Sequence, residues 1–293
     1  MGESKIEWTN ATWNPVRGCS LVSEGCRNCY AMRQAHRQKN GAYKGLTRLG
    51  PHGPVWTGDV RLVPEVLDYP LKLKKPHLIF VNSMSDLFHE SLTDDNIAAV
   101  FSRMWAADHH TYQILTKRPE RMRQWATKYD RKLLAAGRRP LSQWRHVWLG
   151  VSVESDDQRD RIADLVLTPA AVRWVSLEPL LGPMWLDTWL TPRQALSLKW
   201  WQAETGEKVP SWWAENKPLL DWVVVGAESG AGHRPMDFDW VRSLRDQCAA
   251  VGVPFFFKQA IINGKKIGLP FLDGVQHAKF PVSQPFSTLS QTA

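Results

Sequence analysis

The feature that most constrains the fold is a series of short apolar segments that recur at intervals of roughly 25–50 residues. Each is rich in β-branched and aromatic residues, as buried strands are. Helical patterns fill most of the gaps. Near-continuous apolar strands that alternate with helices predict a parallel sheet covered by helices, and so an α/β protein. The predicted strands are His77–Asn82, Thr111–Leu115, His146–Val153, Val172–Leu177, Asp221–Val225 and Val253–Lys258.

Three of the intervening segments carry clear helix signals. Thr93 precedes the apolar-periodic run Ile97–Ala107 and is expected to cap that helix. The apolar residues of Asp156–Leu167 share one helical face. Those of Phe238–Val251 do the same, and this helix is expected to stop at Gly252.

A further strand near Thr12–Arg17 would bring the number of strands to seven, which suits a partial or complete TIM-like β/α barrel. An open doubly wound sheet is the alternative. No GxGxxG sequence follows a predicted strand, so a dinucleotide site has little support. We therefore predict one barrel over residues 1–280, followed by a flexible tail over residues 281–293.

Residues 186–218 lengthen one crossover and carry several tryptophans in a mostly polar context. This insertion is interpreted as a lid, a surface for a protein partner, a base-stacking platform, or a small helical insertion that packs on the barrel. The tryptophans are Trp189, Trp200, Trp201, Trp212 and Trp213.

Polar residues cluster just after the carboxyl ends of the predicted strands. In β/α barrels the active site is built on that face, so six such groups predict one shared site. The groups are Asn82–Asp86, Thr116–Arg118, Ser152 with Glu154, Ser176 with Glu178, Gly226–Ser229 and Lys258 with Gln259.

Three of the four cysteines lie within eleven positions and form a CX6CX2C pattern of Cys19, Cys26 and Cys29. Three thiolates on one tight loop suit a cubane iron–sulfur cluster whose fourth iron has no protein ligand. A zinc site that adds His36 is an alternative, although no second CxxC pair exists. A thioredoxin-like redox pair would leave Cys19 unexplained. Cys248 lies alone on an apolar helix face and is expected to be a buried small hydrophobe.

The charge balance favours a polyanionic partner. Lysine and arginine exceed the acidic residues by eight, and the sequence pI is near 9.4. Nucleic acid is the first such partner to consider. No apolar run approaches the roughly 20 residues that cross a bilayer, and the first residues lack a signal-peptide core. We therefore expect a cytoplasmic protein that does not contact the membrane.

Several long stretches show that the chain resembles a phage-associated, three-cysteine-motif family of radical-SAM-like proteins. The resemblance implies a partial TIM-like barrel, a [4Fe–4S] cluster and S-adenosyl-L-methionine. The usual loop of radical-SAM enzymes is CX3CX2C, so the first spacing is longer here. Ala260 and the insertion also depart from the pattern. The matching stretches are Thr12–Ala31, Phe80–Glu90, Leu115–Met122, Leu149–Ser155, Ser176–Pro183, Asp221–Met236 and Val253–Gln259.

The cofactor implied by the resemblance needs contacts of several kinds. Its amino and carboxylate groups would chelate the open iron, and its ammonium end would meet an acceptor after the second strand. Its ribose hydroxyls need a polar pair, and its adenine needs backbone next to an apolar strand end. The corresponding candidates are Ser83, Ser85 and Asp86 for the ammonium, Ser152 and Glu154 for the ribose, and Val225, Gly226 and Ala227 for the adenine.

Other strand-end residues are candidates for the chemistry itself. Glu178 and Glu228 would bind the cofactor or orient a lysine or arginine. The cations Lys117, Arg118 and Lys258 would meet a phosphate or carboxylate. Tyr30, next to the last cysteine, would relay a hydrogen atom or simply pack.

Three functions fit these features. The leading hypothesis is a radical-SAM enzyme that generates a 5′-deoxyadenosyl radical and acts on nucleic acid, in DNA repair or base modification. It is supported by the charge, the phage association and a loose likeness to DNA-lesion lyases. The second is a radical-SAM enzyme for a small molecule or peptide. The third is a non-catalytic, metal-stabilised protein that binds nucleic acid or a partner.

Overall fold

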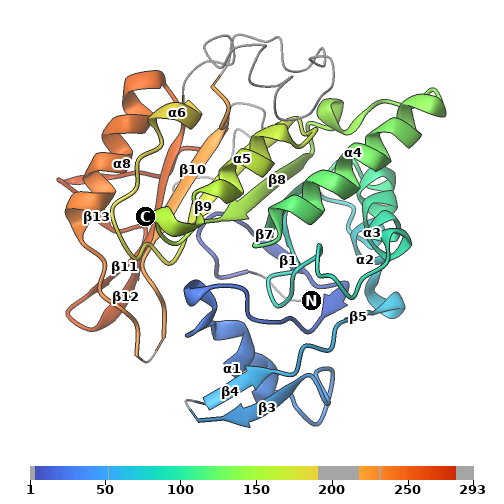
Figure 1. The fold of residues 1–293 in the computed structure, drawn as a ribbon, viewed down its shortest axis with the longest axis horizontal. Coiled ribbons are helices and arrows are strands. Elements are labelled where there is room, and N and C mark those ends of the chain that lie inside the picture. Colours follow the sequence, from blue (N-terminus) through green and yellow to red (C-terminus); the bar gives the residue numbers. More distant parts are fainter. Residues whose placement is uncertain (1–3, 52, 191–217, 231, 282–293) are drawn as a thin grey trace.

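An eight-stranded sheet forms the centre of the fold and curls into a half-barrel (Figure 1). The structure is a computed structural model that describes residues 4–51, 53–190, 218–230 and 232–281. The strands lie in the order β1 (Ala11–Trp13), β6 (Leu78–Val81), β7 (Thr111–Thr116), β8 (Val147–Ser152), β9 (Val172–Leu177), β10 (Trp222–Gly226), β11 (Phe255–Ile262) and β12 (Lys265–Gly268).

The topology is that of a partial TIM-like barrel. All neighbouring strands from β1 to β11 are parallel, and only β12 is antiparallel, to β11. Strand order follows chain order, whereas a doubly wound sheet reverses direction at a switch point. Within the described residues β1 and β12 are the two edges of the sheet, so the barrel is open. The predicted α/β class is confirmed, the half-barrel sheet is compatible with a partial TIM-like barrel, and the strand order differs from that of a doubly wound sheet.

The six predicted central strands are all present, with ends that differ by a few residues. The strand expected near Thr12–Arg17 is divided in two. Its first part is β1, and its second part is β2 (Val16–Arg17), which leaves the main sheet to pair with β5 (Arg61–Leu62).

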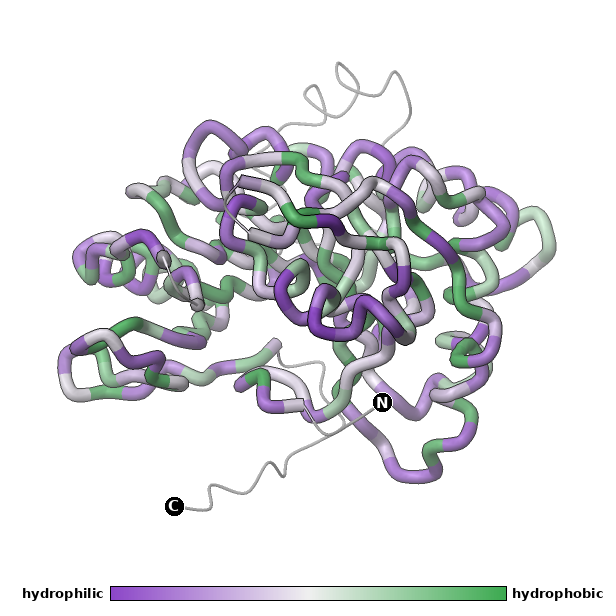
Figure 2. The backbone as a smooth tube through the Cα atoms, turned by 90° about the horizontal axis from the view of Figure 1, so that it is seen from below, coloured by the Kyte–Doolittle hydropathy of each residue, from purple (hydrophilic) through white to green (hydrophobic). Residues whose placement is uncertain are grey.

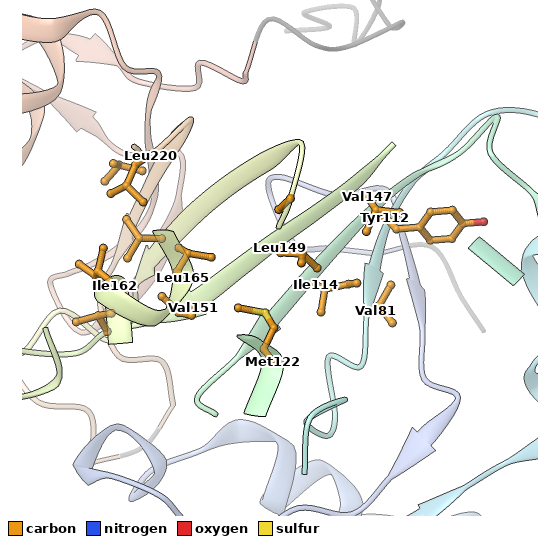
Figure 3. Close-up of a cluster of buried hydrophobic side chains, with 14 of the residues drawn as sticks. Val81, Tyr112, Ile114, Met122, Val147, Leu149, Val151, Ile162, Leu165 and Leu220 are labelled. Atoms are coloured by element: carbon orange, nitrogen blue, oxygen red, sulfur yellow. The ribbon is translucent and has the colours of Figure 1, made fainter. Parts of the chain in front are cut away.

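Helices cover the convex face of the sheet (Figure 1). Apolar side chains from alternate strand positions, such as Val81, Leu149 and Val151, meet Met122 and Ile162 from these helices (Figure 3). Burial of each such side chain contributes roughly 1.5–3 kcal/mol to stability. The helices are α3 (Asp94–Ala106), α4 (Pro119–Ala135), α5 (Asp160–Leu167) and α8 (Phe238–Val251).

Two of the predicted helix ends are confirmed, whereas the helix predicted from Asp156 begins at Asp160, after a short 3-10 turn. The Thr93 hydroxyl accepts a hydrogen bond from the Asn96 amide, and the Asn96 side chain accepts one from the Thr93 amide, which forms a capping box. Helix α8 stops at Gly252, whose φ of 73° lies in the left-handed region that favours glycine.

The concave face is filled by tryptophans rather than by helices. Trp8, Trp148, Trp174 and Trp222 are fully buried there with Phe256. They occupy alternate positions to those that meet the helices, as the pleat of a strand requires. They fill the interior of the half-barrel beneath its carboxyl face.

A small subdomain follows the cysteine loop and projects from one side of the barrel (Figure 1). It contains α1 (Tyr30–Arg37) and the hairpin of β3 (Thr47–Gly50) and β4 (Gly53–Trp56). Its core is formed by Ala35, Tyr43, Leu46 and Trp56 together with other buried residues.

The remaining elements are short. They are α2 (Tyr69–Lys72), α6 (Asp187–Leu190), and the paired strands β13 (Phe271–Leu272) and β14 (Val275–Gln276). Trp189, in α6, packs against the main core. The rest of the predicted insertion, residues 191–217, and the tail after residue 281 lie outside the described residues. Hydrophilic residues line much of the outer surface (Figure 2), and none of the described helices is long and apolar enough to cross a bilayer.

Candidate functional site

A cavity of about 710 Å³ lies at the carboxyl ends of the parallel strands. Its wall includes all three clustered cysteines and residues from each of the six polar groups that follow the central strands. The structure therefore brings the six groups into the wall of one cavity, and their function stays a prediction. Glu154 and Gly226 belong to the same strand ends but do not line the cavity.

The cysteine loop follows β2 and contributes to the wall of the cavity. Gly18 bridges to Ser85, which ties the start of the loop to the segment after β6. Cys26 ends a single 3-10 turn that spans Glu24–Cys26, and Cys29 immediately precedes α1. All three clustered cysteines are half-buried and in the free-thiol form, whereas Cys248 is buried in the core of α8, as predicted.

Burial opposes ionisation of the Cys19 and Cys29 thiols, while neighbouring groups partly favour it. Burial raises the pKa of Cys19 to about 12, and Asp86 adds to this while Arg118 counteracts it. Burial also raises the pKa of Cys29, but the backbone amides of Ala31 and Met32 at the start of α1 lower it. A helix N-terminus next to Cys29 favours a thiolate or an anionic group bound there.

Glu154 forms a hydrogen bond with the cysteine loop. Its side chain is completely buried, and its oxygens accept hydrogen bonds from the Ser23 hydroxyl, from Lys117 Nζ at 3.0 Å and from Arg161 Nη1 at 2.6 Å. Burial favours the neutral acid, but the charges of Lys117 and Arg161 outweigh it and lower the pKa of Glu154. The carboxylate therefore joins the loop to β8 and to α5.

Gly25 permits this close approach. A Cβ at Gly25 would lie 2.2 Å from the Cγ and Oε1 atoms of Glu154, which is closer than real Cβ contacts occur. Any larger residue at this position would push the cysteine loop away from the carboxylate.

A second carboxylate holds the other end of the loop. Glu228, after β10, accepts hydrogen bonds from the Asn28 amide at 3.0 Å and from the backbone and guanidinium of Arg234. Arg234 also donates to the Glu24 carbonyl. The loop between Cys19 and Cys29 is thus attached to the ends of β8 and β10, on opposite sides of its midpoint.

A buried arginine lies next to the first cysteine. Arg118 Nη1 is 3.1 Å from Asp86 Oδ2 and 4.0 Å from Cys19 Sγ, and its Nε contacts Glu90. Arg118 Nη2 also donates to the Ser20 hydroxyl at 2.6 Å. Its positive charge lies where an anionic cluster on Cys19 would be stabilised.

The remaining strand-end carboxylate is paired as well. Glu178 Oε1 lies 3.0 Å from Lys258 Nζ, and the same ammonium lies 5.9 Å from the centre of the Trp8 ring. Gly226 makes room for this pair, because a Cβ there would meet Glu178 Oε1 at 2.2 Å.

The predicted residues lie close together in the structure, and many of them form hydrogen bonds or ion pairs with other residues of the protein. Both oxygens of Asp86 accept hydrogen bonds from the protein, including those of Thr116 and Lys117. The Ser83 and Ser85 hydroxyls donate to Asn14 and to the Val16 carbonyl. The cations that we expected to meet a ligand form ion pairs with strand-end carboxylates. The expected cofactor contacts of these residues, and that of Ser152 in the cavity wall, stay predictions.

Tyr30 lies at the start of α1 and lines the cavity. Its hydroxyl donates to the Ser83 carbonyl at 2.6 Å, so the ring links the cysteine loop to the segment after β6. This contact is consistent with a structural role for Tyr30. The hydrogen-relay interpretation stays a prediction.

Several residues of the site were not singled out from the sequence. Four of them are partners of Glu154 or Glu228, the other two are Ser20 and His89 next to Arg118, and the sequence carries a signal for the two arginines. A buried carboxylate needs a cation, and an arginine follows Glu154 by seven residues and Glu228 by six. The residues that were missed are Ser20, Ser23, Asn28, His89, Arg161 and Arg234.

Three cysteine thiols lie in the wall of one cavity, and thiolates are ligands of zinc sites and of iron–sulfur clusters alike. Among the described residues, no group of three or more His, Cys, Asp or Glu side chains is arranged to hold one metal ion. A mononuclear thiolate site needs its sulfurs about 4 Å apart, since Zn–S bonds are about 2.3 Å long. In a cubane each cysteine binds a different iron, so its sulfurs lie farther apart. Three half-buried thiols on a loop that is held at both ends, with a cation and a helix N-terminus beside them, are donors of the chemical kind that an iron–sulfur cluster uses.

Comparison with known proteins gives one match. A family model described as "Protein of unknown function (DUF5131)" matches residues 3–281, which leaves out only the two ends of the chain. No curated protein and no solved structure matches the chain.

Proposed function

We propose that this chain, which belongs to the DUF5131 family, is a radical-SAM iron–sulfur enzyme. The observation that carries the proposal is the placement of Cys19, Cys26 and Cys29 in the wall of a cavity at the carboxyl face of a partial β/α barrel. That face is where barrel enzymes build their active sites. A site with three protein ligands keeps one coordination position open for catalysis.

When bound, the cluster and S-adenosyl-L-methionine would supply a 5′-deoxyadenosyl radical that abstracts hydrogen from a substrate. The protein's own contribution is positioning and exclusion of water. Glu154 and Glu228 hold the cysteine loop at two points, and Arg118 places a positive charge 4.0 Å from Cys19 Sγ. The tryptophans beneath the cavity close the barrel to solvent from the other end.

The cavity offers polar contacts for a zwitterionic, nucleoside-containing cofactor. Lys117 and Lys258 each keep ammonium donors beyond their carboxylate partner, and both line the cavity. Asn82 also lines it, and its buried Nδ2 has no hydrogen-bond partner among the described residues. These donors suit the carboxylate and the ribose oxygens of such a cofactor.

Anaerobic reconstitution with iron and sulfide tests the proposal. The holoprotein should contain about four irons per chain. With dithionite and S-adenosyl-L-methionine it should release 5′-deoxyadenosine. Each of Cys19→Ala, Cys26→Ala and Cys29→Ala should abolish cluster loading, while the matched variant Cys248→Ala should load normally. A protein that binds zinc instead, or a cluster-loaded protein that leaves S-adenosyl-L-methionine intact, would rule out the enzyme and favour a metal-stabilised binding protein.

The substrate belongs to the same proposal. We favour nucleic acid because the chain carries a net charge of +8. A small molecule or peptide is the second candidate, since a cavity of about 710 Å³ accommodates one. Binding to a nucleic acid should weaken steeply with salt, and its absence would favour the second candidate.

A further inference from the structure

We propose that the subdomain between Tyr30 and Leu62, here called the basic module, is the surface that binds a nucleic-acid strand and presents one nucleotide to the cavity. The inference rests on the proposed function for the identity of the reacting site, but the binding surface can be tested without it. It follows from the concentration of positive charge in this subdomain and from the position of the subdomain next to the cavity.

The basic module carries most of the net charge of the protein. It contains six lysines and arginines and a single acidic residue, Asp59, so its formal charge is +5, whereas the whole chain has +8. It comprises α1, the β3–β4 hairpin and β5. A small part of the sequence therefore accounts for more than half of the net positive charge.

Four of these cations are not engaged by the protein itself. Arg37, Lys39, Lys44 and Arg48 are exposed, and their side chains have no hydrogen-bond or ion-pair partner among the described residues. The cations at the carboxyl ends of the strands, in contrast, are paired with carboxylates. Unpaired cations that gather in one small subdomain produce a local positive potential that attracts polyanions.

The basic module borders the cavity. Tyr30, Ala31 and Gln34 of α1 and Trp56 of β4 are part of the cavity wall. Arg33, one helical turn before Arg37, lies close enough to the loop after β10 that a Cβ on Gly230 would be 3.2 Å from its Nη1. The helix therefore reaches across the entrance, and a strand bound along it would pass over the cavity.

Cations from other elements also contribute to the cavity wall. Lys5 and Lys266 line the cavity, and Lys265, next to Lys266 on β12, is exposed. Lys266 lies 3.3 Å from Glu7, whereas Lys5 forms no ion pair with the described residues. A phosphate backbone at the cavity would therefore meet positive charge from β12 as well as from the basic module.

The size of the cavity limits which form of nucleic acid could enter it. A cavity of about 710 Å³ has the size of a small-molecule site and does not admit a duplex. A reacting base would have to be single-stranded or flipped out of its stack. We therefore expect the basic module to hold the backbone while one nucleotide enters the cavity.

A matched pair of charge variants tests the assignment. The test variant replaces Arg37, Lys39, Lys44 and Arg48 with glutamine. The control variant replaces Lys74, Lys75, Arg138 and Arg145 with glutamine. These control residues are equally exposed, but they lie before β6, after α4 and before β8, at the amino ends of the strands. Both variants lose two lysines and two arginines and keep the cavity wall intact.

The probe is a fluorescein-labelled single-stranded oligonucleotide, with a duplex and an RNA of the same sequence for comparison. Binding is followed by anisotropy over a range of salt concentrations. For four lost phosphate contacts, the test variant should reduce the slope of log K against log salt by about 3 and the affinity at least tenfold. The control variant should leave both within about twofold of the unaltered protein. Iron content and melting temperature of each variant establish that it is folded.

Equal losses in both variants would refute the basic module as the binding surface and leave only diffuse attraction. Polyglutamate that competes as well as the oligonucleotide would replace nucleic acid by an acidic polypeptide as partner. A protein that releases 5′-deoxyadenosine but binds no oligonucleotide would contradict this inference while leaving the proposed function intact. The reverse result, salt-dependent binding without release, would contradict the proposed function alone.

Discussion

The buried carboxylate of Glu154 gives the sharpest test of how the cysteine loop is held. Glu154→Gln keeps the shape of the side chain but removes its charge. Lys117 and Arg161 then lose their shared partner, and the Arg161 side chain, only 10% exposed, cannot regain full hydration. Breaking a buried ion pair by removing one partner costs about 3–5 kcal/mol. Because Lys117 reaches the cavity and is partly hydrated, we expect the lower end, about 3 kcal/mol of unfolding free energy.

The control is Asp164→Asn, the same chemical change at a more exposed pair. Asp164 Oδ1 lies 2.7 Å from Arg123 Nε, and the two side chains are 24% and 30% exposed. Exposed pairs contribute about 0–1 kcal/mol, so this variant should lose less than about 1 kcal/mol. Urea-induced unfolding of the metal-free protein, followed by tryptophan fluorescence, measures both values. Because Glu154 also accepts a hydrogen bond from Ser23, Glu154→Gln should in addition lower iron retention after reconstitution. Equal stability losses in the two variants would refute the reasoning, as would full iron retention by Glu154→Gln.

Three further predictions concern other parts of the structure. Gly25→Ala should lower cluster loading strongly, because the added Cβ would collide with Glu154. The control Gly41→Ala, whose Cβ would have its nearest contact at 3.7 Å, should load normally. Iron analysis of the two reconstituted variants measures the difference. Burial lowers the pKa of His110 to about 4, so the folded state binds fewer protons than the unfolded state. Stability should therefore fall as the pH drops from about 6.5 towards 4, by up to about 3 kcal/mol, and the slope should be shallower in His110→Asn; unfolding curves with equal slopes for the two proteins would contradict this. Thr93→Ala should cost about 1 kcal/mol through loss of the capping box of α3, and an unchanged urea midpoint would count against that contact.

The sequence predicted the sheet well because its signal is local. Each central strand is a run of β-branched and aromatic residues, such as Val172–Leu177, and parallel strands buried on both faces need no alternation. The polar strand ends followed from the same pattern, because barrel topology alone brings them to one face. Thr93 and Gly252 marked helix ends by their own backbone chemistry.

The sequence could not predict which polar groups pair with each other. Glu154 meets Ser23 across 131 positions and Glu228 meets Asn28 across 200, so neither contact leaves a local pattern. The same holds for Arg118 and Cys19, which lie 99 positions apart. The subdomain after the cysteine loop was also missed, because α1 and the strands β3 and β4 are short and mostly polar. The net charge of the chain included the cations of this subdomain, but only the fold shows that they lie next to the cavity.

The most direct test of the account is anomalous scattering from crystals of the anaerobically reconstituted protein, recorded at the iron and the zinc absorption edges. We expect iron signal for a four-iron cluster bound by Cys19, Cys26 and Cys29, with the iron that lacks a cysteine facing the cavity. A single zinc ion bound by these cysteines, or an iron site elsewhere in the chain, would contradict the account.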